Sequence, residues 1–264
     1  MSAALQAVIF DLDDTLLVDE AETRRAMHQT ARFFGVRQPE NFVDTAISRA
    51  HEVWQCNPRL DWCRMLGHSA LEGLWCDYSG DDDNLNALAD WQPRYLREVW
   101  KYTCQNCGIS ELCAGSAARH FQTERDRLHP WMPGAKTLLR FLQRTDRRLA
   151  ILTNGISKLQ WRKMSRSGIA PHFPTIVVSG DFGRGKPDPE IFLHTLERLG
   201  VPAERCLMVG NNPASDILGA QRAGIPCCWL QNDGCPYPER QKTADFVVQE
   251  LEELLRLPVF ADTR

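Results

Sequence analysis

The stretch Phe10-Asp11-Leu12-Asp13-Asp14-Thr15-Leu16 decides the fold class, because it places three carboxylates directly after a short apolar run. That run, Ala7–Phe10, is apolar at every position, which is typical of a strand buried on both faces of a parallel sheet. Three carboxylates so close together repel one another, so a bound cation is a natural way to stabilise them. The alternative is an acidic turn whose carboxylates cap backbone N–H groups.

Further apolar runs predict the rest of the sheet. They are Leu149–Leu152, Ile176–Val178, Cys206–Val209, Cys227–Leu230 and Phe246–Val248. Helical spacing lies between the later runs, as in Ala135, Leu138, Leu139 and Leu142, which fall at i, i+3, i+4 and i+7. Alternating strands and helices predict an α/β fold with a doubly wound, parallel-sheet (Rossmann-like) core.

A long insertion separates the first two predicted strands, and it is far longer than an ordinary crossover. It shows helical spacing, for example at Leu88, Trp91, Tyr95 and Val99, and few strand signals. We therefore predict a mostly α-helical second domain over residues 17–126, inserted into a core formed by residues 1–16 and 127–264.

The composition is that of an ordinary globular protein, with 43% hydrophobic and 25% charged residues. The formal net charge of −3 argues against nucleic-acid or anionic-membrane partners, which favour a basic protein. The first residues show no signal peptide, and no apolar stretch reaches the roughly 20 residues of a membrane helix. We therefore expect a cytoplasmic protein. Nothing in the sequence indicates an oligomeric state.

Three more motifs follow predicted strands or their neighbouring helices, where open α/β sheets bind ligands. Thr153-Asn154-Gly155 offers a hydroxyl and successive N–H groups to an oxyanion. Gly185-Lys186-Pro187-Asp188-Pro189 places a lysine before two prolines, and residues 209–217 read Val-Gly-Asn-Asn-Pro-Ala-Ser-Asp-Ile. Each motif alone is a weak signal, because turns and solvated lysines are common.

Taken in order, the four motifs resemble those of the haloacid dehalogenase superfamily, and the insertion resembles its type-one helical cap. The resemblance covers the whole core. It implies a phosphatase that hydrolyses a small phosphorylated metabolite and uses Mg²⁺ as its cofactor. It also implies that the cap selects the substrate, with Arg24, Arg25, Arg59, Trp54 and Trp62 as candidate contacts. The alternative for these five is a helix-surface arginine or a core tryptophan.

The resemblance implies a role for each motif residue. Asp11 is the expected nucleophile, which forms an aspartyl-phosphate, and Asp13 is the expected general acid and base. Thr153 and Lys186 complete the expected catalytic set, in which the lysine neutralises the crowded negative charge. The expected phosphate-binding residues are Leu12, Asp13, Thr153, Asn154 and Lys186.

The expected metal ligands are Asp11, Asp13, Asn211 and Asp216, and one of them departs from the family pattern. Magnesium-using members that resemble this chain usually have Asp where Asn211 stands, so the site loses a unit charge. Three hypotheses remain: a phosphatase with weakened Mg²⁺ binding, a metal-free dehalogenase, or a degenerate member that binds a phosphorylated ligand or a partner without turnover. Asp13 speaks against the second, because the dehalogenases lack this second aspartate.

Six of the ten cysteines fall within the insertion. Cys104, Cys107 and Cys113 have part of a zinc-like spacing. Three interpretations stay open: structural zinc, an oxidised Cys104–Cys107 pair, and ordinary packing of free thiols.

Overall fold

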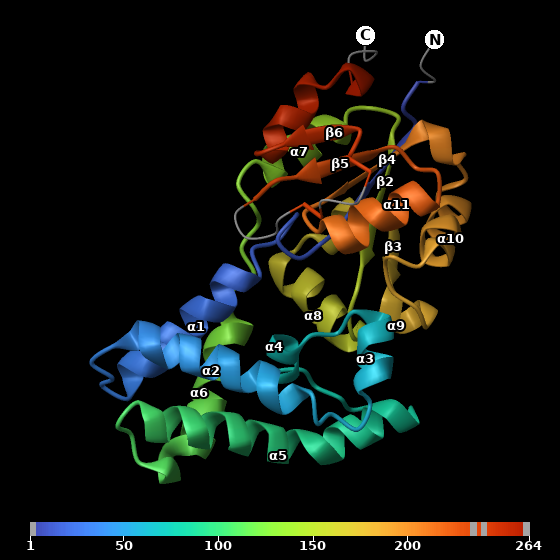
Figure 1. The fold of residues 1–264 in the computed structure, drawn as a ribbon. Coiled ribbons are helices and arrows are strands. Elements are labelled where there is room, and N and C mark those ends of the chain that lie inside the picture. Colours follow the sequence, from blue (N-terminus) through green and yellow to red (C-terminus); the bar gives the residue numbers. More distant parts are fainter. Residues whose placement is uncertain (1–3, 233–236, 239–241, 261–264) are drawn as a thin grey trace. The chain divides into compact units, whose positions relative to one another are not determined.

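The computed structural model describes residues 4–232, 237–238 and 242–260. Its contacts divide the chain into two compact units, residues 1–18 with 130–264 and residues 19–129. Among the described residues, the first unit contains all six strands and the second is helical (Figure 1). The second unit contains the segment that resembles a cap domain, and its role as a cap stays a prediction.

The first unit is built on a parallel sheet of six strands in the order β3-β2-β1-β4-β5-β6. All six predicted strands are present, which confirms the predicted α/β class. They are β1 (Ala7–Phe10), β2 (Arg148–Thr153), β3 (Thr175–Val178), β4 (Cys206–Gly210), β5 (Cys227–Leu230) and β6 (Phe246–Val248). Because β1 pairs with β2 on one side and with β4 on the other, the first motif lies near the middle of the sheet.

Each face of the sheet has its own hydrophobic core, because alternate residues of a strand point to opposite faces. Val8 and Phe10 belong to one core, and Ala7 and Ile9 to the other. The first core includes residues of α7, α8 and η5, and the second includes residues of α10 and α11. These elements are α7 (Ala135–Leu142), α8 (Ser157–Ser167), η5 (Leu251–Arg256), α10 (Pro189–Leu199) and α11 (Leu218–Arg222).

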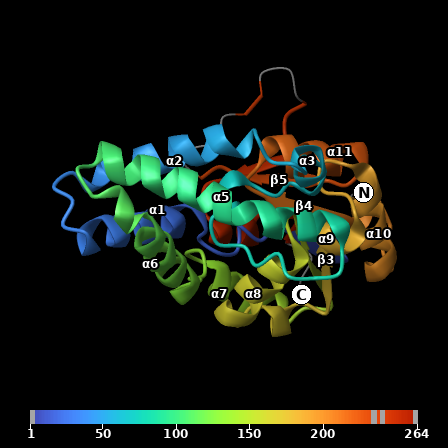
Figure 2. The same ribbon diagram turned by 90° about the horizontal axis from the view of Figure 1, so that it is seen from below.

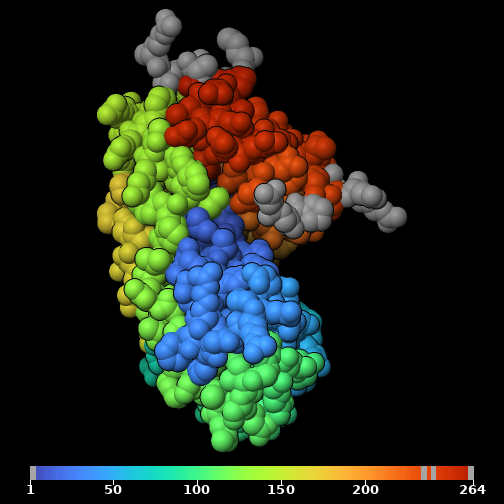
Figure 3. Space-filling model, turned by 90° about the vertical axis from the view of Figure 1, so that its left-hand side faces the viewer, coloured from blue at the N-terminus to red at the C-terminus, as the bar shows by residue number. Residues whose placement is uncertain are grey.

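Local sequence signals explain where these helices begin. Asp188 caps α10 by accepting a hydrogen bond from the N–H of Glu190, and Pro189 occupies the first turn, where both residue types are favoured. The apolar stripe of α7 is buried as predicted. Helix α7 packs against η5, and the space-filling view shows the yellow-green surface of the α7 region beside the red C-terminal segment (Figure 3).

Short elements complete the first unit. They are α9 (Ser179–Phe182), the 3₁₀ turns η2 (Ala170–His172), η3 (Ala203–Arg205) and η6 (Pro258–Phe260), and the π-helical turn η4 (Pro213–Ile217).

The second unit packs its helices around aromatic side chains. Helix α5 lies along α2, and α1 lies along α6 (Figure 2). Trp54 is buried and contacts Trp91, Tyr95 and His68. The helices are α1 (Glu20–Phe33), α2 (Pro39–Trp54), α3 (Leu60–Leu66), α4 (Ala70–Gly73), α5 (Asp83–Asn106) and α6 (Ala114–Arg127), with the 3₁₀ turn η1 (Glu111–Cys113).

The cysteines of the insertion are free thiols in this structure. Burial raises the pKa of Cys104 to about 11, so its thiol stays protonated and uncharged at neutral pH. Among the residues that the structure describes, no three or more His, Cys, Asp or Glu side chains form a group that could hold a metal ion. Ordinary packing is therefore the interpretation that this structure supports for Cys104.

Within the described part of the chain, no helix is both long enough and apolar enough to cross a bilayer.

Candidate active site

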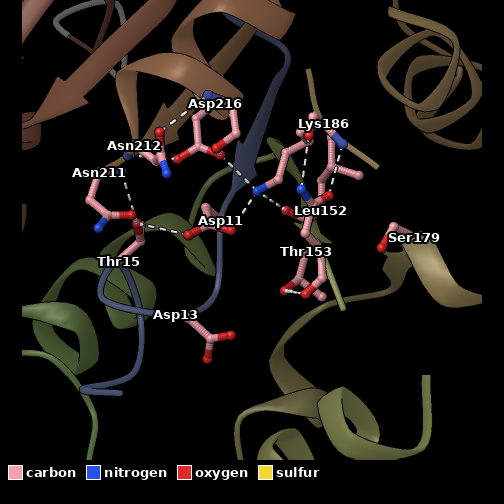
Figure 4. Close-up of polar contacts among 12 residues, drawn as sticks. Asp11, Asp13, Thr15, Leu152, Thr153, Ser179, Lys186, Asn211, Asn212 and Asp216 are labelled. Atoms are coloured by element: carbon pink, nitrogen blue, oxygen red, sulfur yellow. Dashed lines mark hydrogen bonds and ion pairs between the residues drawn. The ribbon is translucent and has the colours of Figure 1, made fainter. Parts of the chain in front are cut away.

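The predicted site residues come together where β1, β2 and β4 end (Figure 4). The register pairs Phe10 with Ile151 on one side and with Val209 on the other. The carboxyl ends of these three neighbouring strands therefore meet at one edge. Asp11 continues the pairing, since its N–H donates to the Val209 carbonyl at 2.9 Å.

Lys186 lies at the centre of this cluster and is 5% exposed. Its ammonium group donates to Oδ1 of Asp11 at 2.5 Å and pairs with Oδ1 of Asp216 at 2.8 Å. A third bond runs to the Leu152 carbonyl at 2.9 Å. An ammonium group has three donors, so these contacts fix the direction of the side chain. Lys186 thereby joins β1, β2 and the segment that follows β4.

The charges of this cluster depend on one another. Burial raises the pKa of Asp11 to about 6, because desolvation disfavours the carboxylate more strongly than Lys186 stabilises it, and Asp216 adds repulsion. Burial alone would lower the pKa of Lys186, but the two carboxylates outweigh this effect and raise it. The lysine therefore stays charged, and the cluster has one carboxylate in excess of its cations.

Asn154 positions the segment that contains Lys186. Its side-chain amide donates to the Lys186 carbonyl at 2.9 Å and accepts from the Lys186 N–H at 2.8 Å. The sequence motif predicts that the backbone amide of Asn154 binds phosphate, whereas the contact of its side chain with the Lys186 backbone was not predicted. Thr153, assigned to the same motif, is the last residue of β2 and is buried.

Thr15 brings two predicted metal ligands to the same side. Its hydroxyl lies 3.3 Å from Oδ2 of Asp11 and 3.2 Å from Oδ1 of Asn211, and it accepts from the N–H of Asn211 at 3.1 Å. Carboxylate and amide oxygens are hard donors of the kind that Mg²⁺ prefers. With the excess negative charge of the cluster, this carboxylate oxygen and this amide oxygen would suit a divalent cation, even though no group of three acidic, His or Cys side chains forms there among the described residues. Thr15 belongs to the first motif, but this role of its hydroxyl was not predicted.

Asp216 is 1% exposed and both of its carboxylate oxygens are engaged. Oδ1 contacts Lys186 and accepts from the Ser215 hydroxyl, while Oδ2 accepts from the N–H of Asn212. A Cβ on Gly210 would come within 2.3 Å of Oδ2, so glycine is required at the end of β4. Asp216 thus anchors Lys186, and direct contact with a metal stays a prediction.

Asp13 points away from Asp11 and Lys186 (Figure 4). Its Oδ2 accepts from the ammonium group of Lys163 at 2.9 Å. Leu12, between the two aspartates, is fully buried, so only its backbone is suited to the predicted contact with phosphate. Lys163 was not predicted. The available signal was its spacing, four residues after Leu159 and next to Met164, which places it on the buried stripe of α8.

The candidate specificity residues all lie in the second unit. Arg24 pairs with Asp44 at 2.9 Å, and Arg25 pairs with Glu22 at 2.6 Å. Trp54 belongs to the aromatic core of this unit. Trp62 is half-buried and Arg59 is exposed. For Trp54 the packing interpretation holds, and for the others a substrate contact stays a prediction.

The sequence profile of the haloacid dehalogenase-like hydrolases matches residues 5–224, a span that contains every residue of the site described above. The chain belongs to this family. The profile match confirms the resemblance seen in the four motifs. As a member of this family, the protein is a hydrolase.

Curated relatives of this haloacid dehalogenase-like hydrolase include phosphatases. The chain is 35% identical to a phosphoserine phosphatase of Thermus thermophilus over 250 residues, which cover 95% of this chain and 98% of the relative. It is 39% identical to the pyrimidine 5'-nucleotidase YjjG of Escherichia coli over 127 residues, which cover 47% of this chain and 56% of that protein.

Solved structures share the fold at low sequence identity. The magnesium-bound hydrolase YfnB of Bacillus subtilis has a TM-score of 0.67 at 22% identity, with 96% of this chain and 98% of that chain covered. The L-2-haloacid dehalogenase of Xanthobacter autotrophicus has a TM-score of 0.62 at 20% identity, with the same coverage. These likenesses support the fold, which phosphatases and dehalogenases share.

Proposed function

We propose that this haloacid dehalogenase-like hydrolase is a magnesium-dependent phosphatase that hydrolyses small phosphomonoesters through an aspartyl-phosphate on Asp11. The observation that carries the proposal is the buried cluster of Asp11, Lys186 and Asp216 at the strand ends, with the second aspartate, Asp13, directed away from it (Figure 4). In a phosphoryl transfer the nucleophile and the leaving oxygen lie on opposite sides of phosphorus. Asp13 lies two residues from Asp11 and apart from the Lys186 cluster, so it is available for the leaving oxygen while Asp11 attacks phosphorus (Figure 4).

In the proposed reaction, a carboxylate oxygen of Asp11 attacks phosphorus and the ester P–O bond breaks. Asp13 gives its proton to the leaving alcohol oxygen and then takes a proton from water. That water attacks the aspartyl-phosphate, releases inorganic phosphate and restores Asp11. Thr153 and the amide of Asn154 hold the phosphoryl oxygens, and Lys186 stabilises the negative charge.

Asp11, Asn211, the carbonyl of Asp13 and Asp216 would hold Mg²⁺, with Asp216 acting directly or through water. When bound, the ion neutralises charge on the transferred phosphoryl group. The support for this assignment is the set of hard oxygens beside Thr15 and the excess of one carboxylate over Lys186.

We expect Asn211→Asp to strengthen Mg²⁺ binding at least about tenfold, because it restores a negative charge within a few ångströms of the cation. The measurement is the Mg²⁺ concentration that gives half-maximal hydrolysis of p-nitrophenyl phosphate.

Asn212→Asp is the matched control, since it adds the same charge one residue away. The Asn212 oxygen already caps η4 by accepting from the N–H groups of Ala214 and Ser215, and aspartate keeps that cap. If both variants shift the Mg²⁺ requirement equally, the effect is one of general charge and Asn211 is not a ligand.

Mg²⁺ affinity should fall at low pH, because a proton on Asp11 competes with the ion. With the pKa of metal-free Asp11 raised to about 6, affinity is nearly constant above pH 7 and weakens about tenfold for each pH unit well below 6. Calorimetric titration with Mg²⁺ at pH 5 and pH 8 measures this. Equal affinities at the two values would contradict the assignment of Asp11 as a ligand.

L-Phosphoserine is the first substrate to test, because the Thermus relative named a phosphoserine phosphatase matches this chain nearly end to end. The assay measures phosphate release from a panel of metabolite phosphates with and without Mg²⁺, beside chloride release from chloroacetate. Metal-dependent phosphate release supports the proposal, and preference for phosphoserine supports that substrate. Metal-independent chloride release without phosphate release would reject the proposed phosphatase function.

A further inference from the structure

A second buried lysine lies beside the proposed general acid. Lys163 of α8 is 1% exposed, and its Nζ donates to Oδ2 of Asp13 at 2.9 Å. Lysine is rarely buried, because removing an ammonium group from water is costly unless a negative partner compensates. A leucine or methionine here would continue the apolar stripe of α8. The lysine is therefore placed by something other than packing.

The position of Lys163 is fixed by its helix. The buried residues of α8 are Leu159, Gln160, Lys163 and Met164, which form one face. Gln160 holds the start of this helix against the second motif: a Cβ on Gly155 would come within 2.5 Å of its Nε2. The turn proposed to hold the phosphoryl group leads directly into the helix that bears the lysine in contact with Asp13, and residues placed on a helix are positioned more precisely than residues on loops.

The two buried lysines contact different carboxylates. Lys186 contacts Asp11, the proposed nucleophile, and Lys163 contacts Asp13, the proposed acid and base. Oδ1 of Asp13 is the oxygen that this ion pair does not involve. A lysine on Oδ2 limits rotation of the carboxyl group and thereby sets the direction of Oδ1. The side chain of Asp13 is 24% exposed, and its ion pair with the buried Lys163 restricts the rotamers that it can adopt.

Resting on the phosphatase function proposed above, we propose that Lys163 is a positioning residue that holds Asp13 by Oδ2 so that Oδ1 delivers the proton to the leaving oxygen. The P–O bond to the alcohol breaks as the O–H bond to it forms, and the Asp13 carboxylate remains paired with Lys163. Lys163 keeps its own protons throughout and touches neither phosphorus nor the leaving group.

The choice of leaving group distinguishes a Lys163 that positions Asp13 from a Lys163 that only stabilises the fold. p-Nitrophenolate is a stable anion and leaves with little help from an acid, whereas an alkoxide needs a proton as it departs. A misdirected Asp13 therefore slows the hydrolysis of alkyl phosphates far more than that of p-nitrophenyl phosphate. Loss of folded protein lowers both rates by the same factor, so the ratio of the two rates does not depend on the folded fraction.

The test compares Lys163→Met with the wild type on L-phosphoserine, or on another alkyl phosphate that the wild type hydrolyses, and on p-nitrophenyl phosphate. We expect kcat to fall about 30- to 100-fold on the alkyl ester and less than about threefold on the aryl ester. Arg166→Met, which removes an exposed cation from the same helix, is the control and leaves the ratio unchanged. Equal losses on both esters would overturn the proposal.

A double variant gives a second, independent readout. If Lys163 acts through Asp13, adding Lys163→Met to Asp13→Asn lowers alkyl-ester turnover no further. A further loss as large as that in the single variant overturns the proposal. A wild-type protein that hydrolyses neither ester would reject the phosphatase function and this inference with it, whereas equal losses from a working wild type reject the inference alone.

Discussion

Asp11→Asn is expected to lower phosphatase turnover by at least about 10⁴-fold, because an amide cannot replace the carboxylate as nucleophile. The variant keeps the shape of the side chain at the end of β1. The measurement is hydrolysis of p-nitrophenyl phosphate at saturating Mg²⁺. Asp14→Asn is the matched control: it removes a neighbouring carboxylate at a backbone position with φ of 55°, which asparagine tolerates. Turnover by Asp14→Asn should stay within about threefold of the wild type.

The folding stability of Asp11→Asn shows whether its lost turnover reflects the missing nucleophile or an unfolded protein. The pKa of Asp11 is raised to about 6 in the folded protein, so the folded state holds a proton more tightly than the unfolded state does. Ionising Asp11 therefore costs the folded wild type about 3 kcal/mol, a loss that develops as pH rises from about 4 to 6. Asp11→Asn removes this loss. Its melting temperature at pH 8 should not be below that of the wild type, and a marked drop would show that inactivity reflects unfolding.

Lys186→Met should cause the largest loss of stability among the site variants. It leaves Asp11 and Asp216 buried without their shared cation, which costs about 3–5 kcal/mol. Lys186 also stabilises charge in the reaction, so turnover should fall about 10²- to 10³-fold. Urea unfolding at pH 7 and hydrolysis of p-nitrophenyl phosphate measure the two effects.

The control for this variant is Lys242→Met, which removes a lysine whose side chain is exposed and should change stability by less than about 0.5 kcal/mol. If Lys186→Met unfolds at the same urea concentration as the control, the ion pairs with Asp11 and Asp216 do not stabilise the fold. The loss should also shrink as pH falls below about 6, because Asp11, whose pKa burial raises to about 6, no longer needs the lysine once it is protonated.

The fold class could be predicted because burial on both faces leaves a continuous apolar signature. Ala7–Phe10 and the segments predicted for β2, β4 and β5 contain no polar residue and are buried at every position, since each face of the sheet packs against its own core. The helices α7 and α10 were predictable for a related reason: each presents an apolar stripe, and α10 also has a capping aspartate followed by proline.

In the candidate site, only the residues that lie at strand ends or in the ordered motifs could be predicted from the sequence. Asp11, Thr153 and Asn211 follow or end neighbouring strands, so a parallel sheet brings them together. The sequence gives no comparable signal for Asn154 acting on the backbone of Lys186, or for Thr15 acting between Asp11 and Asn211. Those contacts depend on loop conformations that side-chain periodicity does not encode.

Local periodicity and motifs in fixed order were enough to predict the strands, helices α7 and α10, the family and the carboxylates at the strand ends. How charge is arranged among these residues depends on the tertiary structure. A lysine in a sequence is normally solvated, and its burial depends on a partner supplied by a distant segment. Asp11 and Asp216 supply it for Lys186, and Asp13 supplies it for Lys163. Burial in this shared environment also raises the pKa of Asp11.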